Sequence, residues 1–177
     1  IITKNNFFDE EYIIKIFKQL VNAIEYLHSL KIAHNDIKLE NIMVVNDIVK
    51  LIDFGLSRKY DNNISTKKCG TLTYISYEMH INNTINPFKN DIWGIGIILF
   101  CCLTKNFPWK FATKTDKFFK LFISENIENK NTFWKSFKKI SKESKELIIN
   151  ICNYEEFRYN ISQIKNSPLI KKYNFAN

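Results

Sequence analysis

Apolar residues near the beginning of the chain recur at steps of three and four positions. This spacing predicts one buried face of a helix, and its members are Ile13, Ile16, Leu20, Ile24 and Leu27. Asp9 can cap the amino end of this helix, and the two glutamates after it suit the positive end of the helix dipole. The helix is expected to end near His28, and a short strand is expected over residues 31–33.

Two runs of mainly β-branched residues follow, at Ile42–Val45 and Ile48–Ile52. Asn46 and Asp47 separate them, and together these features predict a β-hairpin. Residues 56–78 show no clean periodicity and contain polar clusters, so we expect a long functional loop there.

Further helices are predicted in the second half of the chain. Residues 91–103 are apolar on most faces, which indicates a helix in the centre of the core despite Gly94 and Gly96. Amphipathic spacing predicts a helix over 141–152, and a short helix is expected over 161–166. The expected fold class is mainly α with a small β insert, in one domain that covers residues 1–177.

The composition is that of an ordinary globular protein and excludes several classes. Of 177 residues, 45% are hydrophobic and 25% are charged, which argues against disorder. The longest apolar run, Ile95–Leu103, is too short to span a membrane, and no signal peptide is evident. The net charge is +8. Because the lysines are scattered and no nucleic-acid motif is present, we expect no nucleic-acid partner.

The four cysteines show no spacing typical of a metal site. We expect Cys69, Cys101, Cys102 and Cys152 to be buried thiols in a reducing compartment, and therefore an intracellular, cytoplasmic protein. The chain begins with Ile1 rather than methionine, so we expect it to be part of a longer protein. The oligomeric state is not predicted.

Two short motifs carry the chemistry. Residues 34–41 read His-Asn-Asp-Ile-Lys-Leu-Glu-Asn, and Asp53-Phe54-Gly55 begins twelve positions after Asn41. Two acidic groups, a lysine and an asparagine at these spacings are the working parts of a phosphoryl-transfer site. Either motif alone is weak evidence, but both in this order match the protein-kinase pattern, with Asn35 in place of arginine.

The chain resembles the C-terminal lobe of the eukaryotic protein kinase family, over essentially its whole length. Four further pieces occur in the family's order. They are Cys69-Gly70-Thr71, Ser76-Tyr77-Glu78 in place of Ala-Pro-Glu, Asp91-x-Trp93-x-x-Gly96, and Arg158 ten residues before Pro168. Lys38 and Thr71 resemble the serine/threonine branch. The resemblance implies a kinase-like C-lobe that lacks the N-terminal β lobe.

The resemblance also implies a role for each motif position. Asp36 would accept or orient the proton of a serine or threonine hydroxyl on a protein substrate, and Lys38 would stabilise charge at the γ-phosphate of ATP. Asn41 and Asp53 would hold Mg²⁺, which prefers oxygen ligands. The residues expected to contact the nucleotide or its metal are Lys38, Glu40, Asn41, Met43 and Asp53, with Met43 under the adenine.

Other positions would be structural by the same resemblance. Thr71 would tie the activation segment, which begins at Asp53 and has Thr71 near its end, to the catalytic loop of residues 34–41. Asp91 would bind the backbone of that loop. Glu78 and Arg158 would form a buried ion pair, whose disruption leaves an unpaired charge.

Three residues around the motifs are expected in the interior. His34 would pack against Phe54 rather than act as a base. Met43 and Phe54 are expected to be core residues whether or not the chain is a kinase.

Asn35 is a conspicuous departure from the family, because the arginine it replaces pairs with a phosphorylated loop residue. An amide cannot neutralise a phosphate, so we predict that activity depends less on loop phosphorylation. Arg58 and the Lys67-Lys68 pair could partly substitute, and Ser65 and Thr66 remain possible phosphorylation sites.

Two smaller departures concern the substrate side. Tyr77 replaces a proline and changes the expected shape of the docking segment, whereas Leu39 is a tolerated replacement for another proline. Glu40 could meet a basic residue of the substrate, but Cys101 stands where basic-directed kinases often carry a second acid. No substrate preference is therefore predicted.

The chain has four glycines and contains no glycine-rich phosphate loop and no strand lysine of the Val-Ala-Ile-Lys type. We expect it to be inactive in isolation. We also expect its upper face, the side on which the family's N-terminal lobe lies, to be exposed and apolar. Two hypotheses stay open for the parent protein: an active serine/threonine kinase, and a pseudokinase or scaffold without catalysis.

Overall fold

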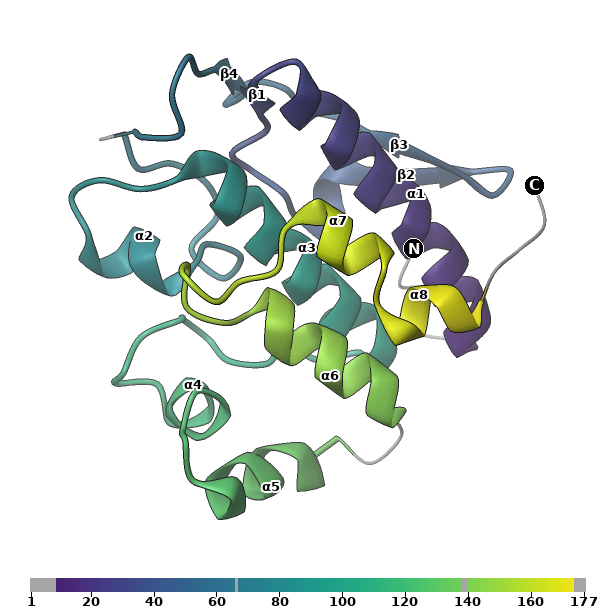
Figure 1. The fold of residues 1–177 in the computed structure, drawn as a ribbon, viewed down its shortest axis with the longest axis vertical. Coiled ribbons are helices and arrows are strands. Elements are labelled where there is room, and N and C mark those ends of the chain that lie inside the picture. The colour runs from purple at the N-terminus through teal and green to yellow at the C-terminus, as the bar shows by residue number, and fades with distance from the viewer. Residues whose placement is uncertain (1–8, 66, 138–139, 174–177) are drawn as a thin grey trace.

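The structure is a computed structural model that describes residues 9–65, 67–137 and 140–173 (Figure 1). Helices dominate it, which confirms the expected fold class. The helices are α1 Glu10–Ser29, α2 Tyr77–Ile81, α3 Pro87–Thr104, α4 Lys117–Phe122, α5 Ile127–Lys135, α6 Lys142–Ile151, α7 Ile161–Lys165 and α8 Pro168–Lys172, with a 3-10 turn η1 at Leu39–Asn41. The strands are β1 Ile32–Ala33, β2 Ile42–Val45, β3 Ile48–Leu51 and β4 Arg58–Lys59.

The strands within the described ranges form two antiparallel pairs. β2 and β3 make the predicted hairpin, in the register Ile42↔Leu51. β4 pairs with β1, a contact that the sequence did not predict, because two-residue strands carry no readable periodicity. This second pair joins the segment before the catalytic loop to the segment after Asp53-Phe54-Gly55.

Helix α1 confirms the predicted amphipathic pattern. Asp9 caps it, and its carboxylate accepts a hydrogen bond of 2.8 Å from the backbone nitrogen of Tyr12. The predicted face is buried except at Leu27, which is half-buried. The hairpin is fastened to α1 at its turn, where Asp47 pairs with Lys15 at 2.8 Å. This ion pair and the contacts between α1 and β3 fix the hairpin against the helix.

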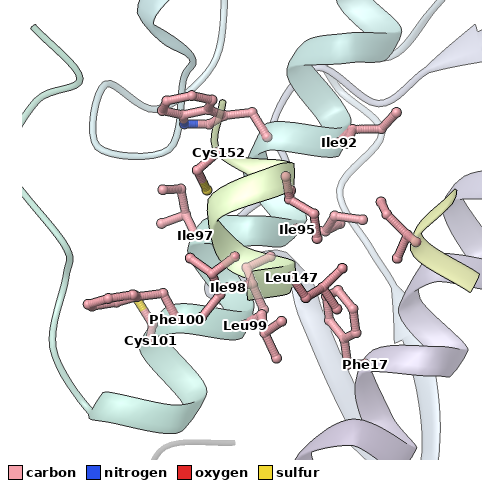
Figure 2. Packing of buried hydrophobic residues seen from close by; sticks show 14 of the residues in the cluster. Phe17, Ile92, Ile95, Ile97, Ile98, Leu99, Phe100, Cys101, Leu147 and Cys152 are labelled. Atoms are coloured by element: carbon pink, nitrogen blue, oxygen red, sulfur yellow. The ribbon is translucent and has the colours of Figure 1, made fainter. Parts of the chain in front are cut away.

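Helix α3 is the central element, as predicted, and lies between α1 and α6 (Figure 1). It begins at Pro87, four residues earlier than expected, because Asn86 caps it. Its apolar side chains pack against Phe17 of α1 and Leu147 of α6 (Figure 2). A Cβ added to Gly96 would lie 2.5 Å from Ile151 Cγ2. Only glycine therefore allows α6 to pack this closely on α3.

Four short helices were not predicted: α2, α4, α5 and α8. Each follows a capping-type residue, and the side chains of Asp116 and Asn126 do accept hydrogen bonds at the starts of α4 and α5. Such caps are readable from sequence, but helices of five to nine residues show too few turns for a clear period.

The core prediction for Met43 and Phe54 is wrong. Met43 is 47% exposed and Phe54 is 49% exposed. In a strand, successive side chains point to opposite faces, so Ile42 enters the core and Met43 faces outward. Val45 and Ile48 are exposed too, which agrees with an apolar upper face.

All four cysteines are free. Cys101 and Cys152 are buried as predicted, whereas Cys69 and Cys102 are only half-buried. Burial raises the pKa of the Cys102 thiol to about 11 and that of the Cys152 thiol to about 12. Among the described residues, no helix is both long and apolar enough to cross a membrane.

Candidate active site

The catalytic loop follows β1 and ends with η1, and Asp91 of α3 anchors it. The carboxylate of Asp91 accepts hydrogen bonds from the backbone nitrogens of His34, at 2.8 Å, and Asn35, at 2.9 Å. His28 Nε2 lies 3.0 Å from the same carboxylate. This confirms the structural role expected of Asp91. A Cβ on Gly94 would lie only 2.8 Å from Ile37 Cβ, so α3 also touches the loop directly.

Asp36 is the centre of the site, and its carboxylate receives four hydrogen bonds or ionic contacts. Oδ1 accepts from the backbone nitrogen of Thr71 at 3.0 Å and from its hydroxyl at 2.8 Å. Oδ2 lies 2.6 Å from Lys38 Nζ and 3.3 Å from Asn41 Nδ2. Three residues from two segments therefore converge on one ionised group, and Thr71 ties the activation segment to the catalytic loop as expected.

These contacts determine the protonation of Asp36 and Lys38. Burial by itself raises the pKa of Asp36, but the hydrogen bonds from Lys38 and Thr71 outweigh it and leave the pKa below its ordinary value. The hydrogen bond to Asp36 raises the pKa of Lys38, and the charges of Glu40 and Asp53 contribute in the same direction. At neutral pH the site therefore holds a carboxylate and an ammonium group in contact.

Asn41 and Asp53 lie at the ends of adjacent strand segments. The backbone nitrogen of Ile52 donates to the Asn41 carbonyl at 2.9 Å, which places Asp53 one residue from this link. Asn41 is buried, and its amide nitrogen is held by the carbonyl of Asp36 at 2.9 Å. Asp53 is exposed, has a left-handed backbone with φ 60°, and accepts from the backbone nitrogen of Gly55.

This donor set fits Mg²⁺ by its chemistry. An amide oxygen and a carboxylate are hard oxygen ligands, and Mg²⁺ commonly takes only one or two protein ligands together with waters and substrate phosphates. The described residues contain no cluster of three or more His, Cys, Asp or Glu that could hold a metal alone. Asn41 and Asp53 thus suit a metal that arrives with a nucleotide.

The remaining predicted contacts lie around this centre. Glu40 is exposed on η1, and Met43 faces outward from β2. The Asp53-Phe54-Gly55 turn rests on the catalytic loop, since the rings of Phe54 and His34 lie 5.1 Å apart. His34 is fully buried and its Nε2 lies 3.1 Å from the Ile52 carbonyl, a structural position.

The segment around Tyr77 is fixed by the predicted ion pair. Arg158 Nη2 contacts Glu78 Oε2 at 2.9 Å, and both residues are buried. Tyr77, in the place of the family's proline, stacks on Phe119 at 5.7 Å and meets Tyr154 edge-on at 5.5 Å. The tyrosine therefore adds aromatic packing to this end of the activation segment.

Three neighbours of the site were not predicted from sequence. Tyr74 accepts a hydrogen bond from the backbone nitrogen of Leu39 at 3.4 Å, Ser57 donates to the His34 carbonyl, and Tyr60 receives one from Asn35. Each contact joins residues that are remote in sequence, so no local signal reveals it.

Comparison with known proteins identifies the class. The sequence matches the protein kinase domain family over residues 1–170. The chain therefore belongs to the eukaryotic protein kinase family, and its relatives place it in the serine/threonine branch.

Three curated relatives illustrate the match. The chain is 32% identical to the probable serine/threonine-protein kinase KIN1 homolog of Enterocytozoon bieneusi over 94% of its length, which is 27% of that protein. It is 40% identical to serine/threonine-protein kinase PRR2 of Saccharomyces cerevisiae, over 64% of the chain and 17% of that protein. It is 38% identical to serine/threonine-protein kinase SBK1 of Danio rerio, over 59% of the chain and 29% of that protein. The chain thus spans less than a third of each of these relatives.

Proposed function

We propose that this chain is the C-terminal lobe of a protein serine/threonine kinase, and that its catalytic loop transfers the γ-phosphoryl group of ATP to a protein hydroxyl. The observation that supports this most directly is the convergence of Lys38, Asn41 and Thr71 on the ionised carboxylate of Asp36. Phosphoryl transfer depends mainly on positioning and charge stabilisation, and these contacts supply both.

Asp36 would orient the substrate hydroxyl and accept its proton. In the structure both carboxylate oxygens are engaged, so a hydroxyl must displace one donor. Lys38 is the donor we expect to move, because its side chain is partly exposed and a phosphate attracts its ammonium group. Nucleotide binding would then free Oδ2 of Asp36 for the substrate.

Asn41 and Asp53 would hold Mg²⁺ against the nucleotide phosphates. When bound, the metal neutralises charge on the transferred group. Glu40 and Met43 complete the proposed nucleotide-binding set, with the exposed Met43 side chain available to the base. We also propose a cytoplasmic location, which the four free cysteines support.

The proposal implies that the 177 residues alone transfer phosphate negligibly. The chain contains no glycine-rich loop or strand lysine to cover the phosphates. We expect weak binding of Mg-ATP by the isolated chain, and catalysis only by a protein that supplies those parts.

The deciding experiment compares Asp36→Ala with Asp61→Ala, which removes an exposed carboxylate from the same region. In a full-length protein that carries this chain, Asp36→Ala should lower the transfer rate by a factor of 10³ or more, and Asp61→Ala should have little effect. Equal rates for Asp36→Ala and wild type would rule out the mechanism.

A pseudokinase is the second candidate, favoured by Asn35 and Tyr77 at positions where the family has arginine and proline. It predicts a full-length protein that binds nucleotide or partner proteins without measurable transfer. Isothermal titration with Mg-ATP, together with a transfer assay, separates the two candidates.

A further inference from the structure

Asn35 lies where both ends of the activation segment meet the catalytic loop. Its side chain nitrogen donates to the Leu56 carbonyl at 2.8 Å and to the Tyr60 hydroxyl at 3.2 Å. At the other end of the segment, a Cβ on Gly70 would lie 2.7 Å from the Asn35 carbonyl oxygen. The start and the end of the segment thus contact the same residue, which is 3% exposed.

The backbone of Asn35 explains why its side chain can make these contacts. Its φ is 67°, in the left-handed region that asparagine tolerates better than most residues. Its backbone nitrogen is fixed by Asp91 at 2.9 Å. The buried carboxylate of Asp91 thus holds the backbone of Asn35, and from this backbone the amide reaches the activation segment.

Other contacts of the segment also use neutral groups. The backbone nitrogen of Tyr60 donates to the Lys31 carbonyl at 2.8 Å, and its ring meets Phe88 edge-on. Further along, Ser65 and Ile85 exchange two backbone hydrogen bonds of 2.9 and 2.8 Å. Neutral groups thus fix the path of the segment at these points.

We infer that Asn35 and Tyr60 are positioning residues that hold the unphosphorylated activation segment against the catalytic loop. This clasp, made of Asn35, Leu56, Tyr60 and Gly70, does with neutral hydrogen bonds what a phosphate paired with arginine does in kinases that depend on loop phosphorylation. That the clasp supports catalysis rests on the proposed function. That it holds the activation segment in place does not.

Hydrogen–deuterium exchange on the unphosphorylated 177-residue chain tests the clasp without catalysis. Asn35→Gly permits the left-handed backbone and removes only the amide, and Tyr60→Phe keeps the ring and removes only the hydroxyl. Exchange over residues 57–64 should rise roughly tenfold in Asn35→Gly and about threefold in Tyr60→Phe. Residues 142–151 of α6 should not change.

Matched controls exist on the surface. Asn46 also has a positive φ, of 50°, so Asn46→Gly controls for the backbone effect, and the exposed Tyr26 controls for loss of a hydroxyl. Unchanged exchange over 57–64 in both clasp variants would overturn the inference. So would an equal rise throughout the chain. If Asn35→Gly does not fold, Tyr60→Phe alone decides.

A second readout uses a full-length protein that carries the chain. Phosphatase treatment or Thr66→Glu should change its transfer rate less than twofold, and Asn35→Gly should lower kcat about tenfold with little change in KM for ATP. Thr66 itself lies outside the described residues. A tenfold activation by Thr66→Glu that Arg58→Ala abolishes would overturn the inference, because it would assign the anchoring to a phosphate. An inactive protein with normal protection over 57–64 would refute the proposed function alone.

Discussion

The hydroxyl of Thr71 stands between the two charged groups of the site. It donates to Asp36 Oδ1 at 2.8 Å and accepts from Lys38 Nζ at 3.2 Å. Because Thr71 belongs to the activation segment and its two partners to the catalytic loop, any displacement of the segment removes both contacts together. The position of the segment is thereby coupled to the protonation of Asp36.

Replacing Thr71 by valine should weaken catalysis more than folding. The substitution keeps the shape and the backbone hydrogen bond to Asp36, but it removes a hydrogen bond to a charged group worth roughly 1.5–3 kcal/mol. We expect the transfer rate to fall roughly tenfold or more, measured in a full-length protein. Thr71→Ser should retain most activity, and Thr73→Val serves as the control. Equal rates for the valine and serine variants would contradict the role of the hydroxyl.

Asp36 should make stability sensitive to acid. Its pKa is lowered in the folded state, so its contribution to the free energy of unfolding is complete above the unfolded pKa, near 3.9, and is lost as the pH falls through the lower folded pKa. Asp36→Asn lacks this contribution at every pH. The difference between the urea midpoints of the two proteins should therefore be constant from about pH 7 to 5 and shrink below about pH 4. A constant difference down to pH 2 would show that the carboxylate is not stabilised by its neighbours.

Local patterns predicted the elements that position the site. The spacing of the apolar residues from Ile13 to Leu27 predicted α1, because burial of one helix face leaves a period in the sequence. The β-branched runs on either side of Asn46 predicted the hairpin. The motif residues Asp36, Lys38 and Asn41 do converge in space. Their convergence follows from the turn η1, which brings the amide of Asn41 back onto Asp36.

Long-range contacts were beyond such patterns. The links from Asn35 to Leu56 and Tyr60 join residues that are more than twenty positions apart, and β4 is too short to leave a period. The exposure of Met43 was also missed, since its apolar character suggested the core whereas the alternation of β2 turns it outward. Composition thus predicts burial less well than position on a defined strand.

Alanine at the two glycine positions of α3 should affect the active site differently. A Cβ at position 94 would lie 2.8 Å from Ile37 in the catalytic loop, and one at position 96 would lie 2.5 Å from Ile151 in α6. Overpacking costs about 1–3 kcal/mol, so both variants should unfold at lower urea. Only Gly94→Ala should also weaken Mg-ATP binding or transfer, because only it displaces the loop. Equal functional losses at matched stability would argue against this division.

The Glu78–Arg158 pair should be the most sensitive point outside the site. Arg158 also donates to the carbonyls of Asn153, at 2.8 Å, and Lys89, at 3.1 Å, and its guanidinium lies 4.8 Å from the Trp93 ring centroid. Arg158→Met should destabilise the chain by about 3–5 kcal/mol, because it leaves the buried Glu78 carboxylate without its partner. Urea unfolding measures this loss.

A matched set of variants separates the lost pair from the lost packing. Glu78→Gln keeps the size of the side chain and removes its charge, so the double variant with Arg158→Met has no unpaired carboxylate and should be more stable than Arg158→Met alone. Lys165→Met, at an exposed pair with Glu25 whose nitrogen and oxygen lie 2.7 Å apart, should cost at most about 1 kcal/mol. If the double variant were no more stable than Arg158→Met, the loss would come from the contacts of Arg158 with Trp93 and the two carbonyls. The buried charge of Glu78 would then not be its cause.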